Sequence, residues 1–394
     1  MAKNPKSLSI RSKIRYFQNS KTHYLQNSGI RCLSIPKCVT FIYQQCLQYF
    51  MQHKTKPQIT CPSCISKNTI KRGKRKRKLR IIQQYQCKSC NKFFSPEVQN
   101  NKTYPLDIIL KALSTYNLGY NLKQTSEKIE KRNKIKIPLS TISNWLNEYK
   151  SICTFSRLRK QSLKLYSPQN ILFQQTLSHI QPYTFKYHKA KLDFLTKENP
   201  KFSALKDYIN KISSNKFPHH IFTYNKETNA NEQRASQLKF SHLNIKAISK
   251  SNQANQLAKL ALNLAKNNND RHTAIQDFML INDSTTIAVE VPVYLTNWDS
   301  GYYKHQRRFV FPLNNYTTPI TGHIDILQIR NRLIHILDYK PEASKSKPIE
   351  QLTIYSLALS RKLNLPLYHF KCAWFDESSY YEFFPLHVVY PKIK

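Results

Sequence analysis

The stretch that decides the fold runs from Thr321 to Tyr355 and reads TGHIDILQIRNRLIHILDYKPEASKSKPIEQLTIY. Two apolar runs rich in β-branched residues flank Asn331 and Arg332, which predicts two strands joined by a two-residue turn. The simplest register of this hairpin sets Asp325 directly opposite Asp338. Both carboxylates are therefore expected on one face.

Lys340 follows Asp338 by two residues, and the alternation of a strand sends both side chains to the same face. Opposed like charges on buried strands are unfavourable, so a hard divalent cation, Mg²⁺ or Mn²⁺, is expected between Asp325 and Asp338. Such a cation activates water and stabilises a phosphate oxygen, with Lys340 supporting the developing charge. The pattern predicts phosphodiester hydrolysis, and the alternative is a strand-end acid beside a surface ion pair.

The order of three short motifs resembles the RecB-like branch of the PD-(D/E)XK nuclease superfamily. The motifs are Gly322-x-x-Asp325, Asp338-x-Lys340 and, on a following helix, Gln351-x-x-x-Tyr355. The resemblance covers the C-terminal third and implies an α/β core of the restriction-endonuclease type, a mixed sheet flanked by helices. It implies that Asp325 and Asp338 are metal ligands and that Lys340 is catalytic. It also implies that Gln351 and Tyr355 support the site or touch the substrate.

Two upstream residues are further candidates for this site. The helical pattern from His272 to Phe278 resembles an element that carries a histidine ligand in the same branch, which implies that His272 completes the metal site. Glu290 lies in the otherwise apolar run Ile287–Val293, so it requires either the metal or a buried hydrogen-bond partner. The alternatives are an ordinary surface histidine and a glutamate that is only hydrogen-bonded internally.

Two C-x2-C pairs, Cys61 with Cys64 and Cys87 with Cys90, are separated by 22 residues. This spacing supplies four thiolates for one structural Zn²⁺, with a β-hairpin between the pairs. The pattern resembles the zinc ribbons at the front of prokaryotic transposases and transcription factors. A disulfide pairing is disfavoured by the reducing compartment that the remaining scattered cysteines indicate.

The segment between the cysteine pairs contains a run with eight basic residues in ten. At the tip of a zinc-held hairpin this run is expected to contact phosphates. Such contacts supply affinity for nucleic acid rather than sequence specificity. A solvated charge run and a nuclear localisation signal are the alternatives. The basic residues are Lys71, Arg72, Lys74, Arg75, Lys76, Arg77, Lys78 and Arg80.

Three helices are predicted between residues 104 and 149. Pro105 begins the first, and the third follows Pro138 with Ser140 as its N-cap and with Ile142 and Trp145 buried. The arrangement resembles a helix-turn-helix of the kind that follows a zinc ribbon in transposases, and a plain three-helix packing unit is the alternative. The residues expected to face DNA are Ser143, Asn144 and Asn147.

These patterns predict a multidomain chain. The expected order is a basic N-terminal extension (1–55), a zinc ribbon (56–100), an all-α helix-turn-helix (101–152), a basic helical bridge (153–250) and the nuclease-like domain (251–394). The front of the nuclease domain is the alternative for residues 153–250. Two strands, over residues 367–374 and 380–389, are expected to close the sheet.

Composition indicates a polyanionic partner. Lys and Arg outnumber Asp and Glu by 63 to 22, the net charge is +41, and the first acidic residue is Glu97. DNA is the expected partner, RNA is not excluded, and no apolar run predicts a membrane span. No signal peptide is evident, so a cytoplasmic, nucleoid-associated location in a prokaryote-like cell is expected.

The leading hypothesis is a metal-dependent DNA nuclease with a zinc-ribbon and helix-turn-helix front end, conceivably related to a mobile element. The principal alternative is a zinc-dependent DNA-binding regulator whose nuclease-like domain is an inactive scaffold. An RNA-directed enzyme is a third hypothesis, because the basic composition does not distinguish the two nucleic acids.

Overall fold

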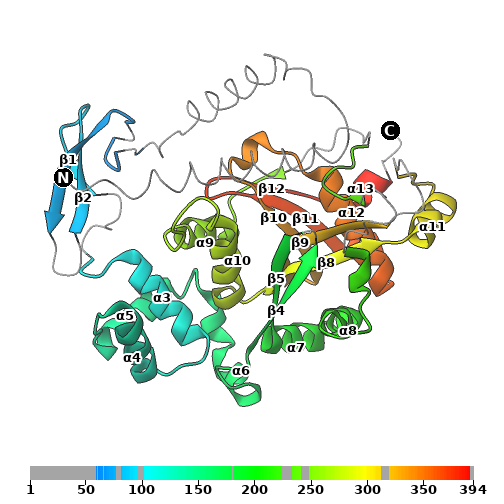
Figure 1. Cartoon of the computed structure of the whole chain (residues 1–394), viewed down its shortest axis with the longest axis horizontal. Helices are drawn as coiled ribbons and strands as arrows, with labels where there is room; N and C mark the ends of the chain where they lie inside the picture. Colours follow the sequence, from blue (N-terminus) through cyan, green and yellow to red (C-terminus); the bar gives the residue numbers. More distant parts are fainter. Residues whose placement is uncertain are drawn as a thin grey trace, which may run out of the picture. The chain divides into compact units, whose positions relative to one another are not determined.

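The computed structural model describes residues 59, 61–64, 66–76, 81–95, 102–179, 181–222, 233–240, 248–311 and 319–390 (Figure 1). The predicted N-terminal extension, residues 1–55, lies outside these ranges. The chain divides into two units. One unit runs to Arg75 and resumes from Gln83 to Pro96, and the other comprises Lys76–Ile82 and everything from Glu97 onward.

The first unit contains a three-stranded sheet beside the four cysteines. Its strands are β1 (Thr69–Lys76), β2 (Ile81–Cys87) and β3 (Phe93–Phe94), in the order β1-β2-β3. Strands β1 and β2 lie between Cys64 and Cys87, which confirms the predicted hairpin between the cysteine pairs. The rings of Tyr85 and Phe94 stack across β2 and β3, with centroids 5.9 Å apart.

The second unit begins with three short helices that pack on one another. They are α3 (Leu106–Asn117), α4 (Leu122–Asn133) and α5 (Leu139–Tyr149). A capping box at Asn121 starts α4, as expected for an asparagine that satisfies free backbone N–H groups. The predicted N-cap at Ser140 is wrong, because α5 already begins at Leu139. Pro138 precedes the helix with a φ of −58°, which favours an earlier start.

The remainder of the second unit is built on a nine-stranded sheet in the order β4-β5-β8-β9-β10-β11-β12-β7, with β6 paired to β9. Strands β10 and β11 are parallel, as are β6 and β9, and the other described pairs are antiparallel. The expected mixed sheet is therefore confirmed. The strands are β4 (Leu172–His179), β5 (Gln181–His188), β6 (Gln233–Arg234), β7 (Ile248–Ser249), β8 (Thr286–Leu295), β9 (Ile320–Arg330), β10 (Leu333–Tyr339), β11 (Phe370–Phe375) and β12 (Tyr380–Phe383).

Helices cover both faces of this sheet (Figure 1). Neighbouring residues of β10 illustrate the two layers. Ile336 belongs to the core under α8 (Ser203–Ile212) and α12 (Ile349–Leu363). Leu337 belongs to the core under α9 (Gln253–Ala261) and α10 (Arg271–Asn282). None of the helices in the described residues has the length and apolar composition needed to cross a bilayer. The helices are α6 (Arg159–Leu165), α7 (Lys189–Glu198), α8 (Ser203–Ile212), α9 (Gln253–Ala261), α10 (Arg271–Asn282), α11 (Asn297–Arg307), α12 (Ile349–Leu363) and α13 (Leu386–Val389).

The β9–β10 hairpin has the predicted turn. Arg330 pairs with Leu333 and Ile326 with Leu337, so the loop is the expected two-residue one. Asn331 and Arg332 have φ values of 52° and 58°, as a type I′ turn requires. One further step of the same register sets Asp325 beside Asp338.

Residues 153–250 contain helices, as expected, but they also contribute strands to the sheet. Strands β4 and β5 pair along their length, and β5 continues the sheet because Lys186 and Tyr187 pair with Val289 and Ala288 of β8. The segment is therefore the front of the sheet domain. Local sequence patterns did not predict the pairing of these strands, because β5 pairs with β8, which lies about a hundred residues later in the chain.

The end of the chain also differs from expectation. The strand predicted over residues 380–389 ends at Phe383, and α13 follows Pro385. Proline lacks the N–H that a further ladder bond would need, so the strand stops there. The other predicted closing strand starts later than expected, at Phe370, after a short 3₁₀ turn at Leu367–His369.

The three-helix unit shares a core with the sheet domain. Helix α3 packs on α10, and the buried amide of Asn117 donates a 2.8 Å hydrogen bond to Asn282 at the end of α10. Asn282 in turn donates to the hydroxyl of Ser114 at 2.9 Å. The helices and the sheet are thus one packed body, joined by hydrogen bonds between Asn117, Asn282 and Ser114.

Lys191, a residue of α7, links this helix to α10 and β8 by hydrogen bonds. Its side chain is completely buried, and its ammonium donates to the backbone carbonyls of Leu280, Asp283 and Thr286. Three donors thus meet three acceptors, two of which belong to the C-terminal turn of α10 and to the residue that follows it. Such carbonyls have no partner within the helix.

We predict that Lys191→Met lowers the free energy of unfolding by about 3 kcal/mol, because three buried carbonyls lose their donor. Urea denaturation followed by circular dichroism measures the loss. Lys160→Met, at an exposed position of α6, is the control and is expected to change stability by less than about 0.5 kcal/mol. Equal effects of the two substitutions would contradict the assigned role.

Candidate functional site

The β9–β10 hairpin brings two carboxylates and an amine together. Asp338 is 2% exposed, and one of its oxygens, Oδ2, lies 2.9 Å from Lys340 Nζ. Asp325 accepts a 3.3 Å hydrogen bond from the backbone N–H of Tyr339. Lys340 remains partly exposed, and its backbone N–H donates to Phe375 of β11. The predicted grouping of Asp325, Asp338 and Lys340 therefore exists.

The two carboxylates perturb each other strongly. Burial and the neighbouring charge of Asp325 raise the pKa of Asp338 well above its ordinary value. Burial also opposes ionisation of Asp325, but hydrogen bonding to His272 and Asp338 outweighs it, so the pKa of Asp325 is lowered. Burial disfavours the charge of Lys340, yet Asp338 and Asp325 raise its pKa above the ordinary value. Lys340 is therefore an ammonium at neutral pH.

Helix α10 supplies two side chains to this region. His272 Nδ1 lies 3.7 Å from Asp325 Oδ2, and Gln276, one turn further along, donates a 2.6 Å hydrogen bond to Glu290. Burial and the charge of Asp325 raise the pKa of Glu290 to about 7. Glu290 has a φ of 52°, a left-handed conformation that is costly for glutamate and is often found at functional sites.

Two histidines, His323 and His179, lie in contact with each other near Glu290. His323 Nδ1 is 3.9 Å from Glu290 Oε2, and its Nε2 lies 2.9 Å from Nδ1 of His179. The ring of Tyr183 stacks on His323 with a centroid distance of 3.7 Å. Burial, reinforced by the charges of His179 and Arg234, lowers the pKa of His323 to about 3. His323 is thus a neutral imidazole that borders the acidic group.

Gln351 and Tyr355 on α12 close one side of the site. The Gln351 amide donates a 2.8 Å hydrogen bond to the Tyr355 hydroxyl, as their spacing of one helical turn permits. Tyr355 packs directly on the backbone of β9, because a Cβ at Gly322 would lie 2.4 Å from its Cε1 atom. Glycine is therefore required at position 322 by the close approach of the ring.

A cavity of 180 Å³ opens between these elements. Its lining includes acidic, basic and imidazole groups. Its lining residues are His179, Arg234, Ser236, Glu290, Thr321, Gly322, His323, Asp325, Gln351 and Tyr355.

The donor set at the hairpin fits a hard divalent cation in part. Both carboxylate oxygens of Asp338 are buried and accept no hydrogen bond of regular geometry from the described residues, and Lys340 forms an ion pair with one of them, Oδ2. Two adjacent buried carboxylates require compensating positive charge. The acidic residues do not form a group of three or more ligands within 4.8 Å of one another, in contrast to the cysteines. Mg²⁺ sites in proteins commonly use one or two carboxylates and keep several waters.

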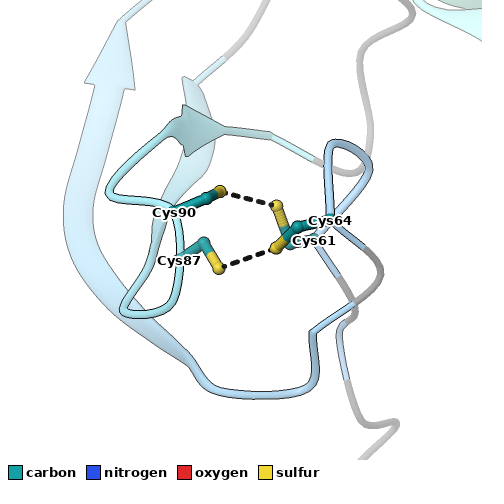
Figure 2. A group of neighbouring side chains, drawn as sticks. All are labelled: Cys61, Cys64, Cys87 and Cys90. Carbon is teal, nitrogen blue, oxygen red and sulfur yellow. Dashed lines mark hydrogen bonds between the residues drawn. The ribbon is translucent and has the colours of Figure 1, made fainter.

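The four cysteines of the first unit form a compact cluster (Figure 2). The sulfurs of Cys61 and Cys90 are 3.6 Å apart, those of Cys64 and Cys87 are 3.5 Å apart, and all four lie within 4.8 Å of one another. Tetrahedral zinc with bonds of about 2.3 Å separates its sulfurs by about 3.8 Å. The cluster can therefore hold one structural metal ion such as zinc.

The predicted nucleic-acid contacts are partly described. Lys71, Arg72, Lys74, Arg75 and Lys76 lie on β1 and are exposed, although Arg72 donates a 2.7 Å hydrogen bond to Gln86. Arg77, Lys78 and Arg80 lie outside the described residues. On α5, Asn144 and Asn147 are exposed and Ser143 is half-buried.

Sequence reasoning missed four side chains near the carboxylates: His179, Arg234, Gln276 and His323. Gln276 carried a signal, since it follows His272 by one helical turn and must share its face. His323 also carried a signal, since it lies two residues before Asp325 and strand alternation sends both side chains to the same face. His179 and Arg234 carried no local signal, because only the pairing of β4, β5 and β6 brings them to the site.

No family model matches this chain, and no curated protein or solved structure shows significant similarity to it. The geometry of the described residues therefore carries the functional argument.

We predict that Gly322→Ala destabilises the protein by about 2 kcal/mol, because the new methyl group overlaps the Tyr355 ring. Gly301→Ala is the matched control, since a Cβ there meets nothing within 4 Å. Gly301 lies within α11, so its replacement is expected to stabilise by about 0.5 kcal/mol. Thermal denaturation of both variants measures the difference, and a harmless Gly322→Ala would contradict the close packing.

We predict that the protein binds one zinc ion per chain through Cys61, Cys64, Cys87 and Cys90. Cobalt substitution is expected to give the thiolate-to-metal absorption of a tetrahedral sulfur site, and Cys87→Ser is expected to abolish it. Cys153→Ser, which alters a buried cysteine of the second unit, is the control. Retention of the full absorption by Cys87→Ser would refute this ligand set.

Proposed function

We propose that the protein is a metal-dependent nuclease that hydrolyses phosphodiester bonds in DNA. The observation that carries the proposal is the buried carboxyl of Asp338, which lies beside Asp325 and 2.9 Å from the ammonium of Lys340. A buried acid pair is costly unless it has a ligand to bind. Its position next to a permanent cation suits a reaction in which negative charge develops on phosphate.

Asp325 and Asp338 would hold the divalent ion, and Glu290 and His272 border the same region. When bound, Mg²⁺ or Mn²⁺ would supply a more acidic water and neutralise charge on a phosphate oxygen. His272 lies 3.7 Å from Asp325 and orients that carboxylate. Glu290 is held by Gln276, and its raised pKa allows it to exchange a proton near neutral pH.

Lys340 acts as a charged donor rather than as a base. Its raised pKa keeps the proton on the amine, and its ion pair with Asp338 fixes the ammonium beside the acid pair. Because 31% of its side chain is exposed, Lys340 is able to meet a phosphate that approaches from solvent. The expected role is stabilisation of the negative charge on the attacked phosphate.

The rest of the chain suits a nucleic-acid substrate. The net charge of +41 favours association with a polyanion, and the exposed lysines and arginines of β1 offer phosphate contacts beside the cysteine cluster. We propose that this first unit is a zinc ribbon and that α3, α4 and α5 form a helix-turn-helix. In this proposal Asn144 and Asn147 on the exposed face of α5 contact DNA.

A non-enzymatic DNA-binding regulator is the second candidate. One observation favours it, since the described acidic residues are not assembled as three ligands within 4.8 Å. The ion pair between Lys340 and Asp338 would then serve only to neutralise a buried acid. Direct assay of cleavage separates the two candidates.

We predict Mg²⁺- or Mn²⁺-dependent cleavage of plasmid or single-stranded DNA, abolished by EDTA. Asp338→Asn and Lys340→Met are each expected to reduce the cleavage rate by about a hundredfold or more, because each removes charge needed in the transition state. Single-turnover measurements with radiolabelled DNA give the rates, and competition with RNA tests the nature of the substrate.

Asp207→Asn, which removes one exposed carboxylate from α8, is the matched control and is expected to cleave at the wild-type rate. Cleavage that persists in both site variants would contradict the proposed nuclease site. Wild-type protein that binds DNA without cleaving it under any of these ionic conditions would favour the regulator.

A further inference from the structure

Arg234 enters the cavity from a strand that is only two residues long. Strand β6 pairs in parallel with the start of β9, with Arg234 opposite Thr321. The next backbone N–H, that of Ala235, donates a 2.9 Å hydrogen bond to the Thr321 carbonyl. The backbone of Arg234 is therefore fixed opposite Thr321, the residue that directly precedes Gly322, and its side chain lines the cavity.

The guanidinium of Arg234 retains unused donors. Its Nη2 atom donates to the carbonyl of His179 at 3.4 Å. Its Nε atom is buried and has no hydrogen-bond partner among the described residues. A guanidinium carries five N–H donors, and a buried charged donor without an acceptor is unfavourable. The arrangement therefore favours an additional acceptor in the cavity.

The acids of the cavity do not supply that acceptor. Glu290 and Asp325 line the same cavity as Arg234, but within the described part of the chain neither forms an ion pair with it. Glu290 is instead held by Gln276, and Asp325 by the Tyr339 N–H. An arginine that served only to neutralise these acids would contact them. Here the cavity keeps positive and negative groups apart.

A phosphate group matches this distribution of charge. The planar fork of arginine donates two parallel hydrogen bonds to phosphate oxygens. Glu290 and Asp325 line the same cavity, where a divalent cation, if bound, would offset their repulsion of the phosphate. A single water needs only about 15 Å³ of such space, so a cavity of 180 Å³ admits a phosphate.

We propose that Arg234 binds a phosphate of the nucleic-acid strand inside this cavity, next to the carboxylates of Glu290 and Asp325. The identity of the ligand as nucleic acid rests on the proposed function. Lys340 does not line this cavity and is paired with Asp338, so the two cations have different tasks. Arg234 binds a phosphate of the nucleic-acid strand, and Lys340 stabilises the negative charge on the phosphate that is attacked.

The test compares Arg234→Gln and Arg234→Lys with the wild type. Fluorescence anisotropy measures the Kd of a short labelled DNA strand in Ca²⁺ over a range of salt concentrations. Arg157→Gln, at an exposed position, is the matched control because it removes the same charge outside the cavity. Thermal denaturation verifies that each variant is folded, and Mn²⁺ titration followed by electron paramagnetic resonance measures metal binding.

Arg234→Gln is expected to raise Kd about tenfold, as for the loss of one charge-assisted contact. The slope of log Kd against log salt concentration is expected to fall by about 0.7 for a single strand. Arg234→Lys should restore the slope but only part of the affinity, since lysine lacks the fork. Mn²⁺ binding should be unchanged.

A set of strands that each carry one neutral methylphosphonate provides the decisive comparison. For the wild type, one position is expected to cost about tenfold in Kd, and in Arg234→Gln the same position should cost nothing further. If every position weakens the variant as much as the wild type, Arg234 contacts no phosphate and the proposal is overturned. Equal Kd values for Arg234→Gln and Arg157→Gln would overturn it as well.

This outcome is independent of cleavage. All binding measurements are made in Ca²⁺, so a wild-type protein that never cleaves DNA defeats the nuclease proposal while the methylphosphonate result still decides the role of Arg234. Conversely, the wild type could cleave DNA while each methylphosphonate weakens Arg234→Gln as much as it weakens the wild type. That result would leave the nuclease proposal intact and overturn only the Arg234 contact.

Discussion

The register of the β9–β10 hairpin is the constraint on which the rest of the site depends. A two-residue turn with positive φ at Asn331 and Arg332 fixes the pairing of Arg330 with Leu333. A slip by one residue would send every side chain of one strand to the opposite face. Asp325 and Asp338 would then separate, and Lys340 would lose its partner. The electrostatic perturbation of the site is thus a consequence of a local turn.

The surrounding elements hold this hairpin rigidly. Strand β8 pairs with β9 on one side and β11 with β10 on the other, so the acids lie within the sheet rather than at an edge. Helix α12 presses Tyr355 onto Gly322. Helix α10 contributes side chains to Asp325 and Glu290 from the opposite core. A site held by elements from both layers retains its geometry with little freedom for its charged groups to separate.

The same packing joins the three-helix unit to the site. Helix α3 contacts α10, and the Asn117–Asn282 hydrogen bond is buried at their junction. Helix α10 also carries His272 and Gln276. A ligand bound by the three helices would therefore be held at a fixed position relative to the carboxylates.

Local patterns were sufficient for several features. The turn at Asn331 and Arg332, the three short helices and the hairpin between the cysteine pairs were predicted because each depends on residues close in sequence. Glu290 was predicted only as an acid in need of a partner. Its bond to Gln276 depends on the packing of α10 on β8, a long-range contact that no local rule contains. The start of α5 was predicted wrongly, because serine was favoured over the proline that precedes the helix.

The sequence by itself predicted which side chains come together: a carboxyl pair with an amine, and four thiols at the spacing of a metal site. The tertiary structure alone decided what surrounds them. Strands β4, β5 and β6 bring His179 and Arg234 to Asp325 from residues more than eighty positions earlier in the chain. The physical reason is that strand pairing is a long-range interaction whose partners are selected by burial of the whole sheet, whereas turns, caps and ligand spacings are set by neighbouring residues.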